Sequence, residues 1–209
     1  MNKIQICNLA LSRIGARRIQ SLTTQSKEAI ECNLLYEFAL KSTLEAYDWG
    51  FARKRVVLAE LSEDYTNWDY AYQWPIDCLA PRYIIDEDGS YTGTSYDIDR
   101  DRDVKVGKVE FVHASNSTLS GRVILTNKED AELVYTAYTE VANLYSPMFI
   151  EALAYKLASE LAQPLRGKLE WQQTMLNNFQ SIIEMAKASN ANQEEKKPQA
   201  ENSLLDSRD

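Results

Sequence analysis

The 209-residue chain contains a single histidine, His113, and this scarcity narrows the chemistry open to it. A catalytic triad needs a histidine beside an activated nucleophile, and no residue pattern indicates such a nucleophile. We interpret His113 as an ordinary half-buried residue of a strand. The seven glycines are never closer than four positions apart, which excludes GxGxxG, and GxxxxGK(S/T) is absent. No phosphate-cradling loop is therefore expected, and the sequence predicts neither an enzyme nor a cofactor.

Cysteines and long apolar runs are also scarce. The three cysteines, Cys7, Cys32 and Cys78, are far apart and odd in number, which excludes a disulfide framework and a zinc site. We expect buried free thiols in a reducing compartment. No stretch approaches the run of about 20 apolar residues that spans a membrane. Residues 1–15 lack a cleavage site and carry polar residues at helical spacing, so we expect a mature helix made in the cytosol.

Charge is abundant but unevenly distributed along the chain, whose net charge is −8. Residues 1–58 hold nine Lys and Arg against five Asp and Glu, a net of +4, whereas residues 59–209 hold fourteen against twenty-six, a net of −12. Binding to phosphates depends on basic side chains that displace counterions, so an acidic protein is not a general nucleic-acid binder. The basic first quarter could still meet an acidic partner.

Two segments near the N-terminus have helical periodicity. Residues 3–14 place apolar residues at helical spacing, and Gly15 follows where a C-cap glycine belongs. Ser26 can cap a second helix, which is expected over residues 27–48. Six residues form the apolar stripe of this second helix, the side of a helix that faces a core: Ile30, Leu34, Leu35, Phe38, Ala39 and Leu44.

Two further helices are expected near the C-terminus. Ser146 is an N-cap followed by proline at the first helical position, and Gln163-Pro164 is expected to close this helix. In residues 167–187 the apolar spacings alternate between three and four, the pattern of a helix packed lengthwise on another. The apolar residues of the first of these helices repeat every four positions: Phe149, Leu153, Leu157 and Leu161.

Strand patterns lie between the two pairs of helices. In residues 68–74 the aromatics alternate with other residues, which predicts a strand with every aromatic on one face, ended by Pro75. Residues 86–104 are expected to be a polar loop or a long hairpin tip. The other predicted strands are residues 54–61, 82–86, 109–114, 122–127 and 132–141.

This order of elements predicts an α+β fold, with a four-helix bundle built from the N- and C-terminal helix pairs and an inserted, mainly antiparallel β domain. The tail is rich in Asn, Gln, Glu, Lys and Ser, so it cannot bury enough apolar surface to fold alone. The predicted units are residues 1–52, the first bundle half; 53–143, the β domain; 144–188, the second bundle half; and 189–209, an extended tail.

A calcium site is the best metal candidate. Alternating aspartates in residues 97–103, followed by Glu110, match several ligand positions of an EF-hand loop. Yet Val104 stands where the sharp turn needs glycine, and Arg100 and Arg102 partly neutralise the acids. We favour a solvated hairpin tip over a metal site.

The stretch YDWGFARKR, residues 47–55, lies where the second helix is expected to stop and the first strand to begin. Gly50 is expected to end the helix in a left-handed conformation. We interpret Trp49 and Phe51 as anchors that pin the helices to the strand block, in preference to a partner-facing hot spot. The basic triplet that follows needs acidic partners: Arg53, Lys54 and Arg55.

Four stretches, in this order, resemble the head-to-tail adaptor of short-tailed bacteriophages, also called tail tubular protein A. ICNLALSRIGARRIQSLTTQSKEAIECNLLYEFAL (6–40) is similar to the family's N-x-A-L-x-R-I/L-G helix, connector and long second helix. YDWGFARKRVVLA (47–59) is similar to its Trp-x-Phe-Ala-x-x-Arg stretch, and YAYQWPIDCLAPR (70–82) to its Tyr-x-Tyr-x-x-Pro-x-Asp-Cys-Leu segment. The fourth stretch is ILTN (124–127) with residues 132–165. Trp74 stands where leucine is commoner, and residues 86–104 and the tail match nothing in the family.

The resemblance implies a structural virion protein without cofactor or membrane. Such adaptors form a dodecameric ring below the portal protein, extend the DNA channel, and receive the nozzle protein and often tail fibres. The acidic residues 59–209 could line a channel that lets DNA slide. The basic triplet then becomes a salt-bridging seam between subunits or with the portal. The tail is expected to order there on assembly, anchored by Leu204 and Leu205.

A DNA-binding regulatory protein that uses the basic N-terminal helices is the alternative. Arg13, Arg17 and Arg18 lie near a turn between two helices, as in a helix-turn-helix. However, the connector, residues 16–25, is longer than the usual turn of about 3–4 residues, and the second helix is long for a recognition helix. An enzyme of unrecognised type is the least favoured class, because no catalytic constellation is present.

Overall fold

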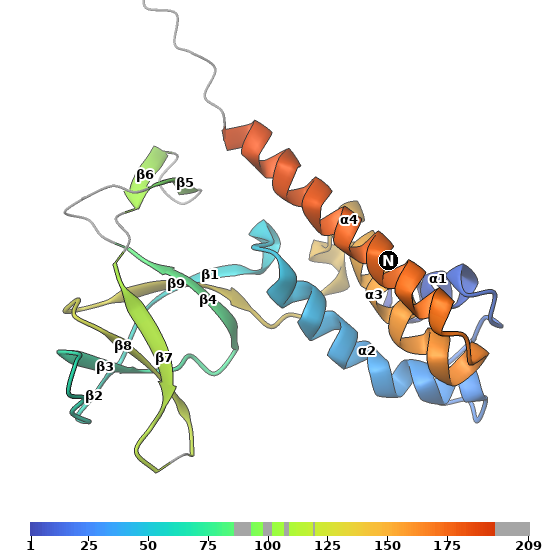
Figure 1. Ribbon diagram of the computed structural model, residues 1–209, viewed down its shortest axis with the longest axis horizontal. Coiled ribbons are helices and arrows are strands. Elements are labelled where there is room, and N and C mark those ends of the chain that lie inside the picture. Colours follow the sequence, from blue (N-terminus) through green and yellow to red (C-terminus); the bar gives the residue numbers. More distant parts are fainter. Residues whose placement is uncertain (86–92, 98–101, 107–108, 119, 195–209) are drawn as a thin grey trace, which may run out of the picture.

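The computed structural model describes residues 1–85, 93–97, 102–106, 109–118 and 120–194. The chain is α+β, as the sequence predicts, with helices gathered at one end and antiparallel sheets at the other (Figure 1). The helices are α1 (Lys3–Arg13), α2 (Lys27–Ala46), α3 (Pro147–Arg166) and α4 (Leu169–Glu194), with short 3-10 turns η1 (Gly50–Ala52) and η2 (Ala142–Leu144).

The helix termini follow local capping chemistry. Asn2 and Gln5 form a reciprocal capping box at the start of α1, and Gly15 follows the helix with a φ of 63°. Ser26 accepts a hydrogen bond from the backbone N–H of Ala29 at 3.3 Å, and Ser146 accepts one from that of Phe149 at 3.2 Å. These caps confirm the predicted starts of α2 and α3.

The end of α3 corrects one prediction. The helix runs through Pro164 to Arg166 and ends at Gly167, which has a φ of 63°. Proline removes one backbone hydrogen bond and crowds the preceding turn. The continuation is favoured because Leu161 and Ala162, on the turn before the proline, are fully buried and hold α3 on the core.

One hydrophobic core contains residues of all four helices. Helix α3 contacts each of the other three helices, so it is central to this core. The predicted four-residue repeat of α3 is confirmed, since all its members are fully buried: Phe149, Leu153, Leu157 and Leu161.

The outward side of α2 corrects a second prediction. Ile30, Leu34 and Phe38 are 51%, 69% and 55% exposed, although the sequence pattern assigned them to the apolar stripe. The inward face mixes large residues with small ones, and the small ones let neighbouring helices approach closely. Its buried residues are Ala29, Cys32, Tyr36, Ala39, Leu40, Thr43 and Leu44.

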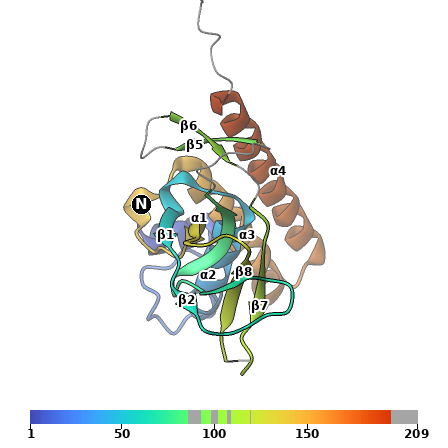
Figure 2. The ribbon, with the colours of Figure 1, turned by 90° about the vertical axis from the view of Figure 1, so that its left-hand side faces the viewer.

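Nine strands form three antiparallel sheets in the part of the chain that the structure describes. The sheet orders are β1-β9-β4, β2-β3-β8-β7 and β5-β6, and Figure 2 looks onto this end with the helices behind. The strands are β1 (Arg53–Val57), β2 (Glu60–Leu61), β3 (Tyr70–Gln73), β4 (Cys78–Ile84), β5 (Gly93–Asp97), β6 (Arg102–Val106), β7 (Phe111–Ser115), β8 (Arg122–Thr126) and β9 (Glu132–Ala137).

The three- and four-stranded sheets share a core. Tyr72 and Ile124 of one sheet and Leu133 of the other belong to the same buried cluster. Residues 54–61, predicted as one strand, are divided between the two sheets as β1 and β2. The chain changes sheets at Leu58, whose backbone N–H donates to the carbonyl of Ala131 at 2.9 Å.

The aromatics of residues 68–74 do not all share one face, which corrects a third prediction. Tyr70, Tyr72 and Trp74 contribute to the core between the sheets. Trp68 instead packs with a separate cluster that includes Val123. The reason is that β3 begins only at Tyr70, so the alternation of a strand does not extend to Trp68.

His113 also differs from its prediction. It lies on β7, at the edge of the four-stranded sheet, and is exposed and not half buried. Its ring stands edge-on to Trp74, with 6.0 Å between ring centroids. All three cysteines are free and buried, as predicted.

Two leucines of α2 test which side of this helix faces the core. We expect Leu40→Ala to lower the free energy of unfolding by about 2–5 kcal/mol, because Leu40 is fully buried and its truncation leaves a cavity. Leu34→Ala, the matched control on the exposed side, should change it by less than about 0.5 kcal/mol. Urea unfolding of both variants measures the difference, and equal losses would contradict the assignment of faces.

Candidate functional site at the junction of helices and sheet

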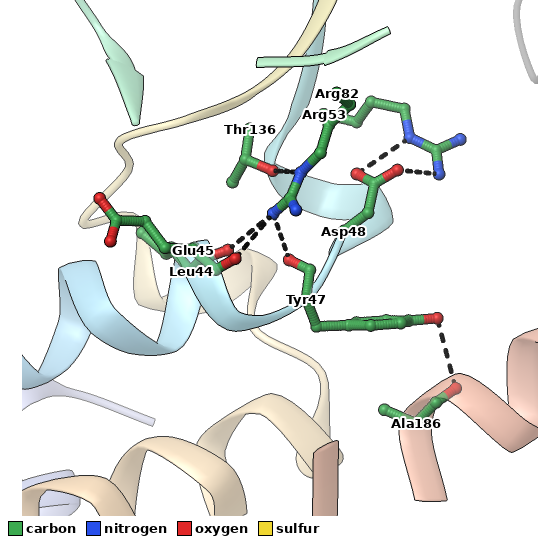
Figure 3. Close-up of polar contacts among 8 residues, drawn as sticks. All are labelled: Leu44, Glu45, Tyr47, Asp48, Arg53, Arg82, Thr136 and Ala186. Carbon is green, nitrogen blue, oxygen red and sulfur yellow. Dashed lines mark hydrogen bonds and ion pairs between the residues drawn. The ribbon is translucent and has the colours of Figure 1, made fainter. Parts of the chain in front are cut away.

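The end of α2 is capped by an arginine from the sheet. Helix α2 ends at Ala46, has no basic residue in its last turn, and is followed by an extended Tyr47. The last carbonyls of a helix have no partner within it. Arg82 of β4 supplies one, because its Nη2 donates to the carbonyls of Leu44, Glu45 and Tyr47 at 3.3, 3.2 and 2.9 Å (Figure 3).

Arg82 also binds the neighbouring strand. Its Nε donates to Oγ1 of Thr136 on β9 at 2.7 Å, and Thr136 is fully buried. Burial lowers the pKa of Arg82, while the charge of Asp48 opposes this effect. A buried cation is costly unless its donors are used. The four acceptors offset that cost and fix the position of the sheet against α2.

Trp49 is the aromatic centre of the same junction. Its side chain is 4% exposed, and its Nε1 donates to the carbonyl of Thr43 at 2.8 Å. Its ring stands edge-on to Tyr47 and to Phe149 of α3, with 5.0 Å between ring centroids in each pair. Trp49 therefore anchors the chain to the helical core, and its buried side chain offers no surface to a partner.

Phe51 continues this cluster at the surface of the core. It is half buried and lies 4.9 Å from Phe149 and 5.4 Å from Tyr145, between ring centroids. Tyr47 reaches α4, where its hydroxyl donates to the carbonyl of Ala186 at 3.3 Å (Figure 3). Edge-on aromatic pairs add about 0.5–1.5 kcal/mol each to simple burial. The aromatics thus join the turn after α2 to both C-terminal helices.

Gly50 does not have the predicted role. Helix α2 ends four residues before it, and Gly50 begins the 3-10 turn η1 without a left-handed φ. The cap that a left-handed glycine would have supplied comes from Arg82 instead.

The basic triplet forms three ion pairs within the chain. Arg53 contacts both carboxylate oxygens of Asp48, with Nη2 at 2.7 Å from Oδ2 (Figure 3). Lys54 donates from Nζ to Oδ2 of Asp77 at 2.5 Å. Arg55 contacts both carboxylate oxygens of Glu132 in the same way, with Nη2 at 2.6 Å from Oε2.

Strand register explains two of these pairs. Arg55 lies opposite Val134 in the β1–β9 ladder, so Glu132 is its diagonal neighbour on the same face. Lys54 lies directly opposite Tyr135, and the Tyr135 hydroxyl also donates to Asp77, at 2.8 Å. The acidic partners that the triplet needs are thus supplied within the chain. The triplet therefore does not need an acidic partner on another subunit, which corrects the sequence-based reason for a seam. The salt-bridging seam with a neighbouring subunit or the portal stays a prediction.

Asp77 has a lowered pKa because of this arrangement. Burial opposes its ionisation, but hydrogen bonds from Lys54 and Tyr135 outweigh burial and favour the carboxylate. Burial, and then the hydrogen bond to Asp77, raise the pKa of Tyr135. The lowered pKa of Asp77 links the stability of this corner of the sheet to pH.

Other predicted site residues lie elsewhere. Leu204 and Leu205, and the side chains of residues 97–103, are outside the described residues. Glu110 is described and exposed. Among the residues that the structure describes, no group of three or more His, Cys, Asp or Glu could hold a metal ion. None of the helices in this part of the chain combines the length and apolarity needed to cross a bilayer.

No protein-family model matches this chain, and no curated protein matches it either.

Replacing Arg82 tests whether it holds the junction together. Arg82→Met keeps the length of the side chain but leaves the carbonyls at the end of α2 and the buried Thr136 without their donor. We expect the free energy of unfolding to fall by about 1.5–3 kcal/mol, the range for hydrogen bonds to charged groups. Arg122→Met is the control, because Arg122 is exposed and lies over the ring of Trp74. Equal losses in urea unfolding would sink the capping role.

Asp77→Asn tests the link to pH. Because the folded-state pKa of Asp77 is below the ordinary 3.8, its contribution is present above that value and is lost as pH falls through the folded-state pKa. We expect Asp77→Asn to be less stable than wild type at pH 7 and to lose less stability on acidification below about pH 4. Thermal unfolding between pH 7 and pH 2 measures this, with exposed Asp64→Asn as control. Parallel curves for wild type and Asp77→Asn would contradict it.

Proposed function

We propose that this chain is a structural virion protein, a head-to-tail adaptor of the tail tubular protein A class. It forms a ring below the portal, extends the DNA channel and docks the tail nozzle. One observation carries the proposal: the four stretches that resemble this family meet at one junction. Leu40 of the first stretch, Trp49 of the second and Phe149 of the fourth belong to one hydrophobic core, and Leu79 of the third packs against it.

This meeting matters because the four stretches are far apart in sequence. The resemblance rests on the shared order of the four stretches along the chain. Their contacts in space are a separate observation, because that order does not require them. In the proposed subunit the helices form a four-helix bundle from the N- and C-terminal pairs. Residues 53–143 form the inserted β domain. The predicted tail, residues 189–209, begins within α4, which runs to Glu194, and the rest of it follows this helix.

The charge distribution suits a channel wall. The three ion pairs of the triplet use cations of the first quarter internally. Residues 59–209, with their net charge of −12, then supply the acidic surplus. DNA carries one charge per about 1.7 Å, so an acidic lining repels it and lets it slide. Genomic DNA passes through without sequence-specific binding.

The partners follow from the proposed position in the tail or neck of the virion. Twelve copies close a ring through two unlike lateral faces, as head-to-tail contacts require. The portal lies above the ring, and the nozzle and tail fibres attach below it.

The DNA-binding alternative is less favoured by the contacts of the basic N-terminal residues. The Arg13 guanidinium lies 3.5 Å from the ring centroid of Tyr155 and donates to the carbonyl of Glu151 at 3.0 Å. Arg13 therefore serves the packing of α1 on α3. Arg17 and Arg18 stay exposed, and a salt-dependent gel shift that they alone support would favour this alternative.

Mixing the chain with the cognate portal protein tests the adaptor role. We expect a stable complex that shows twelve-fold rings below the portal in electron micrographs. An acidic protein of similar mass is the control for non-specific association. Absence of any complex at low and physiological salt would contradict the proposal, whereas complete rings are expected to form only on the portal template.

A further inference from the structure

The outward face of α2 carries an apolar stripe that is largely uncovered in the described chain, where Lys156 Nζ lies 5.4 Å from the ring centroid of Phe38 at one end. Ile30, Leu34 and Phe38 follow one another at four-residue spacing and are each more than half exposed. Single exposed apolar residues are normal, but contiguous patches mark contact surfaces. By helical geometry Lys27 and Lys41 lie on the same side, one at each end of the stripe.

A preformed groove lies beside this stripe. It has a volume of about 580 Å³, with apolar walls from Leu22, Ile30 and Leu34 and a polar rim that includes Gln25 and Asn33. This volume is within the range of about 300–1,000 Å³ typical of ligand sites. The groove lies between α2 and the connector that precedes it.

The connector is fixed where it crosses α1. The Asn8 side chain donates to the carbonyl of Ile19 at 2.8 Å and accepts from its backbone N–H at 2.7 Å. Ile19 itself is buried. Two reciprocal hydrogen bonds and a buried side chain hold the connector, so the groove wall at Leu22 needs little ordering when a ligand binds.

The chemistry of the groove indicates an apolar ligand with acidic flanks. Lys27 is exposed, and no acid in the described part of the chain pairs with it. A cation beside an apolar groove favours a segment that carries negative charge next to its apolar residues.

One segment of the chain has this composition. In ENSLLDSRD, residues 201–209, Leu204 and Leu205 are adjacent and are the only apolar pair of the tail. Glu201, Asp206 and Asp209 outnumber Arg208, so the segment is acidic around its leucines.

The length of the tail favours the groove of another copy over the groove of the same chain. Helices α2 and α4 run in the same general direction (Figure 1). The hydrogen bond between Tyr47 and Ala186 shows which positions along the two helices lie side by side. Glu194 then lies about 12 Å beyond Ala186, and Leu34 about 20 Å back from Tyr47, at 1.5 Å per helical residue. The resulting separation of about 30 Å does not include the path around the helices. Ten fully extended residues span at most about 33–36 Å, so a chain has almost no slack to fill its own groove.

We propose that the tail segment 201–209 of one copy inserts Leu204 and Leu205 into the α2 groove of a second copy, with its acidic residues beside Lys27. The tail thereby straps neighbouring subunits together. This inference rests on the self-association in the proposed function, but it does not depend on the portal.

Cysteine cross-linking of the full-length chain tests the strap. A Leu34→Cys chain is mixed with a separately tagged Leu205→Cys chain and mildly oxidised. The native thiols are buried and do not compete. We expect a 34–205 heterodimer at least five-fold above the yield with Leu169→Cys, a control residue on α4 that is 71% exposed. Adding Leu204→Asp to the Leu205→Cys chain should abolish the excess.

Two results would overturn the proposal. The first is equal cross-linking of the Leu205→Cys chain to positions 34 and 169. The second is a Leu34→Cys/Leu205→Cys double variant that closes on itself at every dilution, because the tail would then fill its own groove. Rings on the portal without a 34–205 cross-link would sink only the strap. A cross-link without portal binding would sink only the adaptor role.

Discussion

One guanidinium determines how the two ends of this molecule are held together. Arg82 comes from the sheet, yet three of its four acceptors are backbone carbonyls at the end of α2, and the fourth is a buried threonine of the adjacent strand. Backbone carbonyls cannot be changed by substitution, so the helix offers this site whatever its side chains are. The relative placement of helices and sheet therefore depends on a donor that only one long, forked, permanently charged side chain supplies.

The turn beside Arg82 divides its residues between the same two ends. Trp49 and Phe51 pack towards the helices, whereas Lys54 and Arg55 pair with acids of the sheet region. Cations follow aromatics within a few positions because the chain passes from a helical core to an edge strand there. A stretch that looks like a binding patch in the sequence is thus an internal joint, with its charges neutralised on site.

Local signals were readable from the sequence, and so was the buried face of α3, whereas the buried face of α2 was readable only in part. Ser26, Ser146 and Gly15 act within one turn of their own position, so the helix starts and the end of α1 could be predicted. Half of the predicted α2 stripe was wrong, because four-residue spacing looks the same whether it faces a core or a partner: Ala39 and Leu44 are buried, whereas Ile30, Leu34 and Phe38 are exposed. Arg82 was missed because three of its acceptors are backbone carbonyls 35, 37 and 38 residues away, which carry no side-chain signal, and the fourth, Thr136, is 54 residues away. Only strand pairing brings them together.

The three large apolar residues on the outward side of α2 have a thermodynamic consequence. A subunit built this way withholds apolar surface from its own folding, so part of its stability is deferred to association. Any species that covers Ile30, Leu34 and Phe38 binds the folded chain and not the unfolded one. In the proposed strap the covering species is a second copy of the chain, so by mass action the melting temperature would rise with protein concentration. The chain would be at its least robust when newly made and dilute, and would gain resistance to heat as copies accumulate.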